Sequence, residues 1–126
     1  MKAGVRCHDP GAEYYFDEGC FITELSNIAD DPAVSVARAR LAPGRTTRWH
    51  YLRGIAERYV LLEGRGRVEV EGMAPREVAP HDVVLIPPGA RQRIHNIGED
   101  DLVFLAVCSP RFEASAYVDA DDTQAL

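Results

Sequence analysis

The spacing of short apolar runs between proline- and glycine-rich turns is the feature that most constrains this chain. Seven runs are rich in β-branched residues, several alternate in polarity, and no segment keeps a sustained helical period. Turn residues such as Pro43-Gly44 and Pro87-Pro88-Gly89 separate them. Regularly spaced short strands predict an all-β sandwich or barrel. The runs are 20–27, 33–42, 57–64, 67–72, 82–88, 91–98 and 102–110.

The chain has the length and composition of one globular domain. Its 126 residues are 46% hydrophobic, which suffices for a hydrophobic core. We expect a single domain over 1–126, with a core barrel at about 33–110, N-terminal strands at about 13–27 and a loose acidic tail at about 114–126. No apolar run has the length of a membrane span, and the amino terminus lacks a signal-peptide pattern. These features predict a cytoplasmic protein without membrane association.

The charge is acidic overall but unevenly distributed. The net charge of −6 disfavours nucleic-acid binding. Residues 38–93, however, carry eleven arginines against six acids, whereas the flanking segments are strongly acidic. Two interpretations remain open: the arginines line a pocket for an anionic small molecule, or they are solvated strand and turn residues. The three cysteines are too few and too widely spaced for a disulfide framework.

Two sets of polar and turn residues stand out, one in each half of the core. The first set comprises Gly44, His50, Glu57 and Gly64, with Leu52 two residues beyond the histidine. The second set runs through "HDVVLIPPGARQRIHN" and comprises His81, Pro87, Gly89, Gln92 and Asn96.

These two sets, in this order, resemble the two motifs of the cupin family, and the chain resembles a small single-domain, RmlC-like cupin over about residues 33–110. The family has a second histidine where Leu52 stands, a glycine where His81 stands and a histidine where Gln92 stands. The resemblance implies a double-stranded β-helix (jelly-roll) barrel and a homodimer. It leaves the chemistry open, because a fold does not decide a function.

The resemblance places the candidate site residues inside the barrel. Strand alternation puts His50 and Leu52 on one face, and Glu57 and Tyr59 on one face of the next strand. His50, Glu57 and Gln92 are the candidate metal ligands. Their cofactor would be a divalent ion (Mn, Fe, Ni or Zn) bound weakly, because two of the family's three histidines are absent, or there would be no metal.

Further roles fall to two neighbours of these ligands. Glu57 and Tyr59 are the candidate catalytic residues, since a carboxylate and a phenol can exchange protons with a substrate. Arg48 and Tyr59 are the candidate substrate-binding residues, and Arg48 is also a possible partner for a buried Glu57. The alternative for Tyr59 is an ordinary core aromatic with a hydrogen-bonded hydroxyl.

Several functions fit this site. The first is a metal-dependent enzyme acting on a small anionic or sugar-like metabolite, as an isomerase, lyase or oxygenase. The second is a metal-free sensor or carrier that binds a small molecule without converting it. The third is assembly, in which the fold serves as a homodimer with no useful pocket and the site is a structural relic. A homodimer is compatible with each of them, and the sequence offers Val60, Leu62, Trp49, "EYYF" and "CFITEL" as interface candidates.

Overall fold

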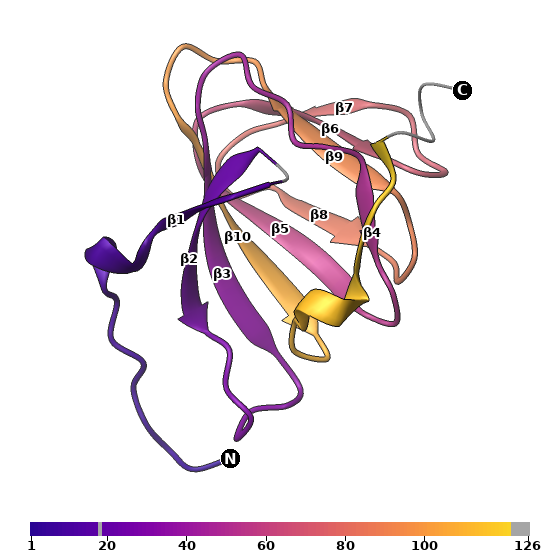
Figure 1. The fold of residues 1–126 in the computed structure, drawn as a ribbon. Helices are drawn as coiled ribbons and strands as arrows, with labels where there is room; N and C mark the ends of the chain where they lie inside the picture. Colours follow the sequence, from indigo (N-terminus) through magenta and orange to yellow (C-terminus); the bar gives the residue numbers. More distant parts are fainter. Residues whose placement is uncertain (18, 122–126) are drawn as a thin grey trace.

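The chain folds as two antiparallel β-sheets that face each other across one hydrophobic core (Figure 1). The computed structural model describes residues 1–17 and 19–121. The six-stranded sheet has the order β1-β2-β3-β10-β5-β8, and the five-stranded sheet has the order β11-β4-β9-β6-β7. The expected all-β jelly-roll barrel is thereby confirmed. The strands are β1 (Tyr14–Phe16), β2 (Cys20–Ser26), β3 (Ser35–Leu41), β4 (His50–Leu52), β5 (Ala56–Glu63), β6 (Gly66–Val70), β7 (Arg76–Val78), β8 (Val83–Ile86), β9 (Gln92–Asn96), β10 (Leu102–Ser109) and β11 (Tyr117–Asp119).

The core forms because alternate residues of both sheets turn inward. Every second residue is buried in β9, and in β5 as far as Leu61, as the period of two requires. Two short 3₁₀ helices, η1 (Pro10–Ala12) and η2 (Ala114–Ala116), are the helical segments of the described chain. None of its helices is long and apolar enough to cross a bilayer.

Turn glycines connect the two sheets. The sequence Gly64-Arg65-Gly66 predicts a tight hairpin with positive φ, and Gly64 has φ of +81°. The turn does not close a hairpin, however, because β5 pairs with β8 and β10 while β6 pairs with β7 and β9. It instead carries the chain from one sheet to the other. Gly66 is required for space, since an added Cβ would lie 3.0 Å from a methyl group of Leu102.

His81 lies in an exposed turn, in agreement with the turn pattern of its sequence "APHDV". Its φ is +77°, and it is the one non-glycine residue with positive φ in the described part of the chain. A side chain is disfavoured in this conformation. The cupin motif has a glycine at the position of His81, and this positive φ explains why glycine is suited to it.

Both ends of the chain add short strands to the barrel. Tyr14–Phe16 form the edge strand β1, which pairs with β2 of the same chain. Tyr117 pairs with Leu52, so that β11 extends the other sheet beyond β4. The loose tail expected from residue 114 is therefore ordered up to residue 121, because Tyr117–Asp119 find a partner strand distant in sequence. The last five residues of the predicted tail lie outside the described residues.

Candidate functional site

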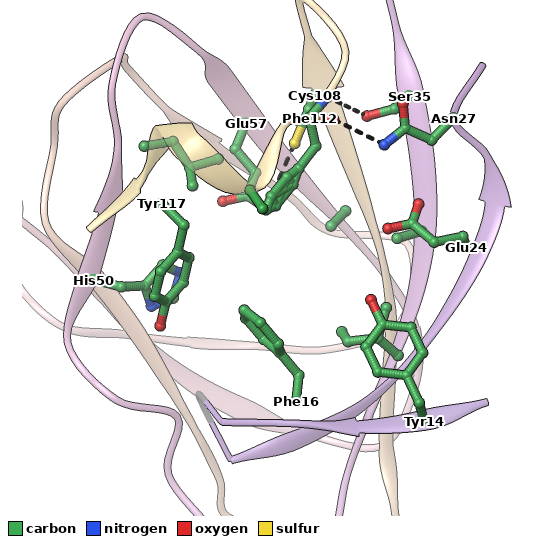
Figure 2. A pocket seen from close by; sticks show the side chains of 15 residues that line it. Tyr14, Phe16, Glu24, Asn27, Ser35, His50, Glu57, Cys108, Phe112 and Tyr117 are labelled. Atoms are coloured by element: carbon green, nitrogen blue, oxygen red, sulfur yellow. Dashed lines mark hydrogen bonds between the residues drawn. The ribbon is translucent and has the colours of Figure 1, made fainter. Parts of the chain in front are cut away.

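A cavity opens between the two sheets at the end of the barrel where β1, β4 and β11 meet (Figure 2). Its volume is about 200 Å³. Pockets for drug-sized ligands usually measure about 300–1,000 Å³, so this cavity suits a compact molecule. Its wall contains four aromatic side chains, Tyr14, Phe16, Phe112 and Tyr117, together with the ionisable residues His50, Glu57, Glu24 and Cys108.

His50 is held rigidly in the cavity wall. It begins β4, and only 3% of its surface is exposed. Its Nδ1 lies 2.8 Å from the carbonyl oxygen of Arg48. A carbonyl only accepts, so Nδ1 carries the proton and Nε2 carries the lone pair. The ring also stacks on Tyr117, with centroids 5.1 Å apart. These contacts present an imidazole nitrogen that can accept a proton.

Glu57 lies in the same cavity wall on β5 and is 8% exposed. Its Oε2 lies 3.8 Å from Sγ of Cys108. Burial, and secondly the negative charge of Glu57, raise the pKa of the Cys108 thiol well above its usual range. The thiol therefore stays protonated and donates to the carboxylate. Cys108 orients Glu57 and is not a nucleophile, since a thiolate is needed for that role.

Tyr59 and Gln92 face inward as the alternation predicts, but they lie deeper in the barrel. Both are buried, and the Tyr59 hydroxyl donates a hydrogen bond to Oε1 of Gln92. The Tyr59 ring packs against Phe104, with centroids 4.6 Å apart. Neither residue lines the cavity. Two residues of a strand span about 7 Å, so Tyr59 lies about that much farther along the barrel than Glu57.

Replacing Tyr59 by Phe tests this placement. The change leaves the buried amide oxygen of Gln92 without its hydroxyl donor, so we expect a loss of about 1–3 kcal/mol in the free energy of unfolding. Tyr15→Phe, at an exposed position of β1, should leave stability unchanged. Urea unfolding measures both. Wild-type stability together with lost turnover in Tyr59→Phe would instead support the catalytic role predicted from the sequence.

Arg48 lies outside the cavity. Its Nε donates to Oδ2 of Asp119 at 3.0 Å, and its guanidinium also lies 3.7 Å from Asp121. The sequence predicts that Arg48, two residues before His50, shares its face. Arg48 lies before the first residue of β4, however, so strand alternation does not extend to it. The structure therefore directs its guanidinium toward the acidic segment around β11.

Sequence reasoning missed the aromatic part of the wall. Tyr14 and Phe16 share one face of β1, and their alternation in "EYYF" was the available signal. Phe112 and Tyr117 follow the predicted core, and no local pattern indicates that the chain returns to the cavity there. Glu24 and Asn27 also line it from the region of β2.

The fold and the cavity define a single-domain double-stranded β-helix barrel with a small internal pocket. Residues 37–108 match the model of the Cupin domain. The chain belongs to the cupin family.

Known proteins extend this comparison. The chain is 32% identical over 114 residues to Uncharacterized protein MJ1618 of Methanocaldococcus jannaschii, covering 89% of this chain and 90% of that protein. A predicted oxalate decarboxylase of Thermotoga maritima is similar with a TM-score of 0.66 and 29% identity, covering 72% of this chain and 80% of the other. Pac13 of Streptomyces, a nucleoside dehydratase, shares the fold with a TM-score of 0.74 and 14% identity, over 94% and 91% of the two chains.

The donors in the cavity do not match a resident metal centre. Of the three predicted ligands, His50 and Glu57 line the cavity, whereas the amide oxygen of Gln92 already accepts from Tyr59. Within residues 1–17 and 19–121, no three His, Cys, Asp or Glu side chains are grouped so that they could hold a metal ion. Tightly bound catalytic zinc usually has three protein ligands.

Metal content provides a direct check. We expect protein purified without an affinity tag or chelator to contain well below one metal ion per chain by elemental mass spectrometry, since two ligands bind weakly. Manganese, iron, nickel and zinc should each be offered before a second measurement. Near-stoichiometric metal that is lost in His50→Ala and Glu57→Gln would contradict this expectation and establish the site predicted from the sequence.

Proposed function

We propose that this cupin is an enzyme that transfers a proton on a compact metabolite, as a lyase or isomerase, with His50 and Glu57 as its acid–base pair. The observation that carries the proposal is the convergence of these two buried ionisable side chains on one largely apolar cavity. Such convergence is typical of catalytic pockets. The similarity to a dehydratase and to a predicted decarboxylase supports the same reaction class.

The chemistry follows from the two side chains. Nε2 of His50 accepts a proton from a carbon or hydroxyl of the substrate while the Arg48 carbonyl holds the ring through Nδ1. The electron pair of the broken bond forms a new double bond. When Glu57 holds a proton, it delivers that proton to the leaving oxygen as the C–O bond breaks in an elimination. In an isomerisation it delivers the proton to a neighbouring carbon of an existing double bond, whose π electrons form the new C–H bond. The surrounding aromatic side chains limit the access of water.

Hydrogen exchange with solvent tests the proposal before the substrate is identified. The protein is incubated in D₂O with panels of small hydroxy, oxo and amino metabolites, and deuterium uptake or loss of water is followed by mass spectrometry. The double variant His50→Ala/Glu57→Gln serves as the blank. Exchange or water loss that the wild type alone produces would support the proposal.

Two other outcomes separate the alternatives. The metal-dependent enzyme stays a prediction, and exchange that requires added divalent metal would support it. The sensor or carrier also stays a prediction. A metabolite that raises the melting temperature while remaining unexchanged and unconverted in every assay would replace the enzyme proposal with it.

The expected homodimer is proposed here through the outer face of β5 and β8. Val83 is 55% exposed and Leu85 is 70% exposed on the edge strand β8, and Val83 pairs with Val60 of β5. Exposed apolar side chains on an edge strand favour association with a second copy.

Light scattering tests this interface. We expect the wild type to have about twice the chain mass of 13.9 kDa. Leu85→Glu should shift it toward the monomer, whereas Val5→Glu, at an even more exposed apolar residue of the amino terminus, should not. A monomeric wild type would contradict the proposal.

A further inference from the structure

The two acidic side chains in the cavity wall, Glu24 and Glu57, favour a positively charged ligand over an anionic one. Glu57 lies in the inner part of the wall and Glu24 is exposed at its mouth. No lysine or arginine lines the cavity among the described residues. The carboxylate of Glu24, and that of Glu57 whenever it has given up its proton, would repel an anionic substrate.

Two of the arginines that suggested an anionic ligand form ion pairs away from the cavity. Arg40 pairs with Glu13 at 2.7 Å and with Asp101 at 3.3 Å, and Arg48 pairs with Asp119 at 3.0 Å. Glu13 and Asp119 belong to the acidic flanking segments of the chain. Arg40 and Arg48 of the basic middle are therefore paired with acidic residues of the flanking segments and not with the cavity.

Aromatic rings form much of the remaining wall. Phe16 contacts Tyr117 edge to face, with centroids 5.2 Å apart and planes at 77°. Tyr117 in turn stacks on His50. In Figure 2 His50 and Tyr117 lie on the side of the cavity opposite Glu24, Tyr14 lies beside Glu24, and Phe16 lies between these two sides. The ligand space is thus enclosed by ring faces and edges from several directions.

Phe112 is fixed in this wall by two polar residues of the cavity. Its backbone N–H donates to Oγ of Ser35 at 2.9 Å, and its carbonyl accepts from Nδ2 of Asn27 at 2.8 Å. Asn27 is held in turn by Arg111, whose Nη1 lies 2.9 Å from Oδ1 of Asn27. A ring position secured through its own backbone is preorganised for a ligand.

We propose that the natural ligand of this cavity carries a cationic ammonium group, bound among the aromatic rings and neutralised by Glu24. An ammonium ion is attracted by the negative faces of aromatic rings and by a nearby carboxylate. This inference rests on the proposed function, since the same cavity receives the substrate. Glu24 and the four aromatic residues lie outside residues 37–108, so the selectivity belongs to the segments that flank the family core.

The surroundings of Glu24 are consistent with this role. Although Glu24 is exposed at the cavity mouth, its carboxyl group is partly desolvated by its neighbours. This desolvation raises its pKa, and a hydrogen bond from Asn27 acts in the opposite direction. A cation bound beside the carboxylate would lower that pKa again. Binding of an ammonium ligand should therefore strengthen as the pH rises through the titration of Glu24.

Three probes of nearly equal shape test the charge preference. Choline, 3,3-dimethylbutan-1-ol and 3,3-dimethylbutanoate share a branched apolar head and differ in charge. We expect isothermal titration calorimetry at low salt to show choline binding about tenfold or more tightly than the neutral alcohol, and the anion binding most weakly. Equal or tighter binding of the alcohol or the anion would overturn the proposal.

Matched variants test whether the preference for choline comes from the residues of the cavity wall. Glu24→Gln and Phe16→Leu should each weaken choline binding by about threefold to tenfold. Glu99→Gln, in an exposed turn, and Phe21→Leu, on β2 outside the cavity, make the same chemical changes elsewhere and should bind as the wild type does. Equal affinities of Glu24→Gln and Glu99→Gln for choline would contradict the assignment.

The outcomes separate this inference from the enzyme proposal. Turnover of a neutral or anionic metabolite that depends on His50 and Glu57, with no preference for choline, would retain the enzyme and remove the ammonium site. Selective choline binding without any exchange or conversion of amino metabolites would retain the site and remove the enzyme.

Discussion

Glu57→Gln and His50→Ala are each expected to reduce turnover by about 10²- to 10⁴-fold, the range that one general acid or base contributes. Glutamine keeps the size of the side chain but can no longer give up or accept the proton. Alanine removes the whole imidazole ring, and with it the Nε2 atom that accepts the proton. The Arg48 carbonyl fixes the tautomer of this ring through Nδ1. Initial rates with the substrate found by hydrogen exchange provide the measurement.

The controls for this prediction carry the same changes outside the cavity. Glu99→Gln and His8→Ala replace exposed residues and should retain wild-type rates. Circular dichroism must show the β-sheet spectrum for every variant, so that lost turnover is not lost folding. Wild-type rates in both cavity variants would remove His50 and Glu57 from the mechanism.

Gly64→Ala is expected to lower the free energy of unfolding by about 2–5 kcal/mol, a large part of the stability of a small domain. Two costs combine at this turn. The backbone φ of +81° disfavours any side chain, and an added Cβ would lie 2.7 Å from the carbonyl oxygen of Asp101. That oxygen belongs to the backbone, so it cannot move aside cheaply.

Gly72→Ala separates the two costs. Gly72 has φ of +83° but nothing within 4 Å of an added Cβ, so it carries the conformational cost alone, about 1–2 kcal/mol. Chemical denaturation of both variants gives the difference. Equal losses would show that the approach of Asp101 to the β5–β6 turn contributes nothing.

Local patterns predicted most of the barrel. The seven runs correspond to β2, β3, β5, β6, β8, β9 and β10, because half-buried strands impose a period of two on the sequence. The same period placed His50 and Leu52 on one inward face, and both are buried. Cys20 and Cys108 lie in apolar runs of the sequence, which predicts that they are small core residues, and both are buried.

Depth along the barrel and long-range pairing could not be predicted in this way. Alternation tells which face a residue occupies, but not how far along the barrel axis it lies, and therefore did not distinguish Glu57 in the cavity from Tyr59 beneath it. The pairing of Tyr117 with Leu52 joins segments far apart in sequence. The aromatic wall and the partners of Arg48 depend on such pairings.

The edge strands β1 and β11 have a consequence for motion. Each has three residues and pairs with a strand on one side within its sheet, whereas β5 and β10 have eight residues and neighbours on both sides. Short edge strands open locally at a much smaller free-energy cost than central ones. Amide protons of β1 and β11 should therefore exchange well before those of β5 and β10. Since these two strands carry Phe16 and Tyr117, their fraying would set the rate at which a ligand enters and leaves.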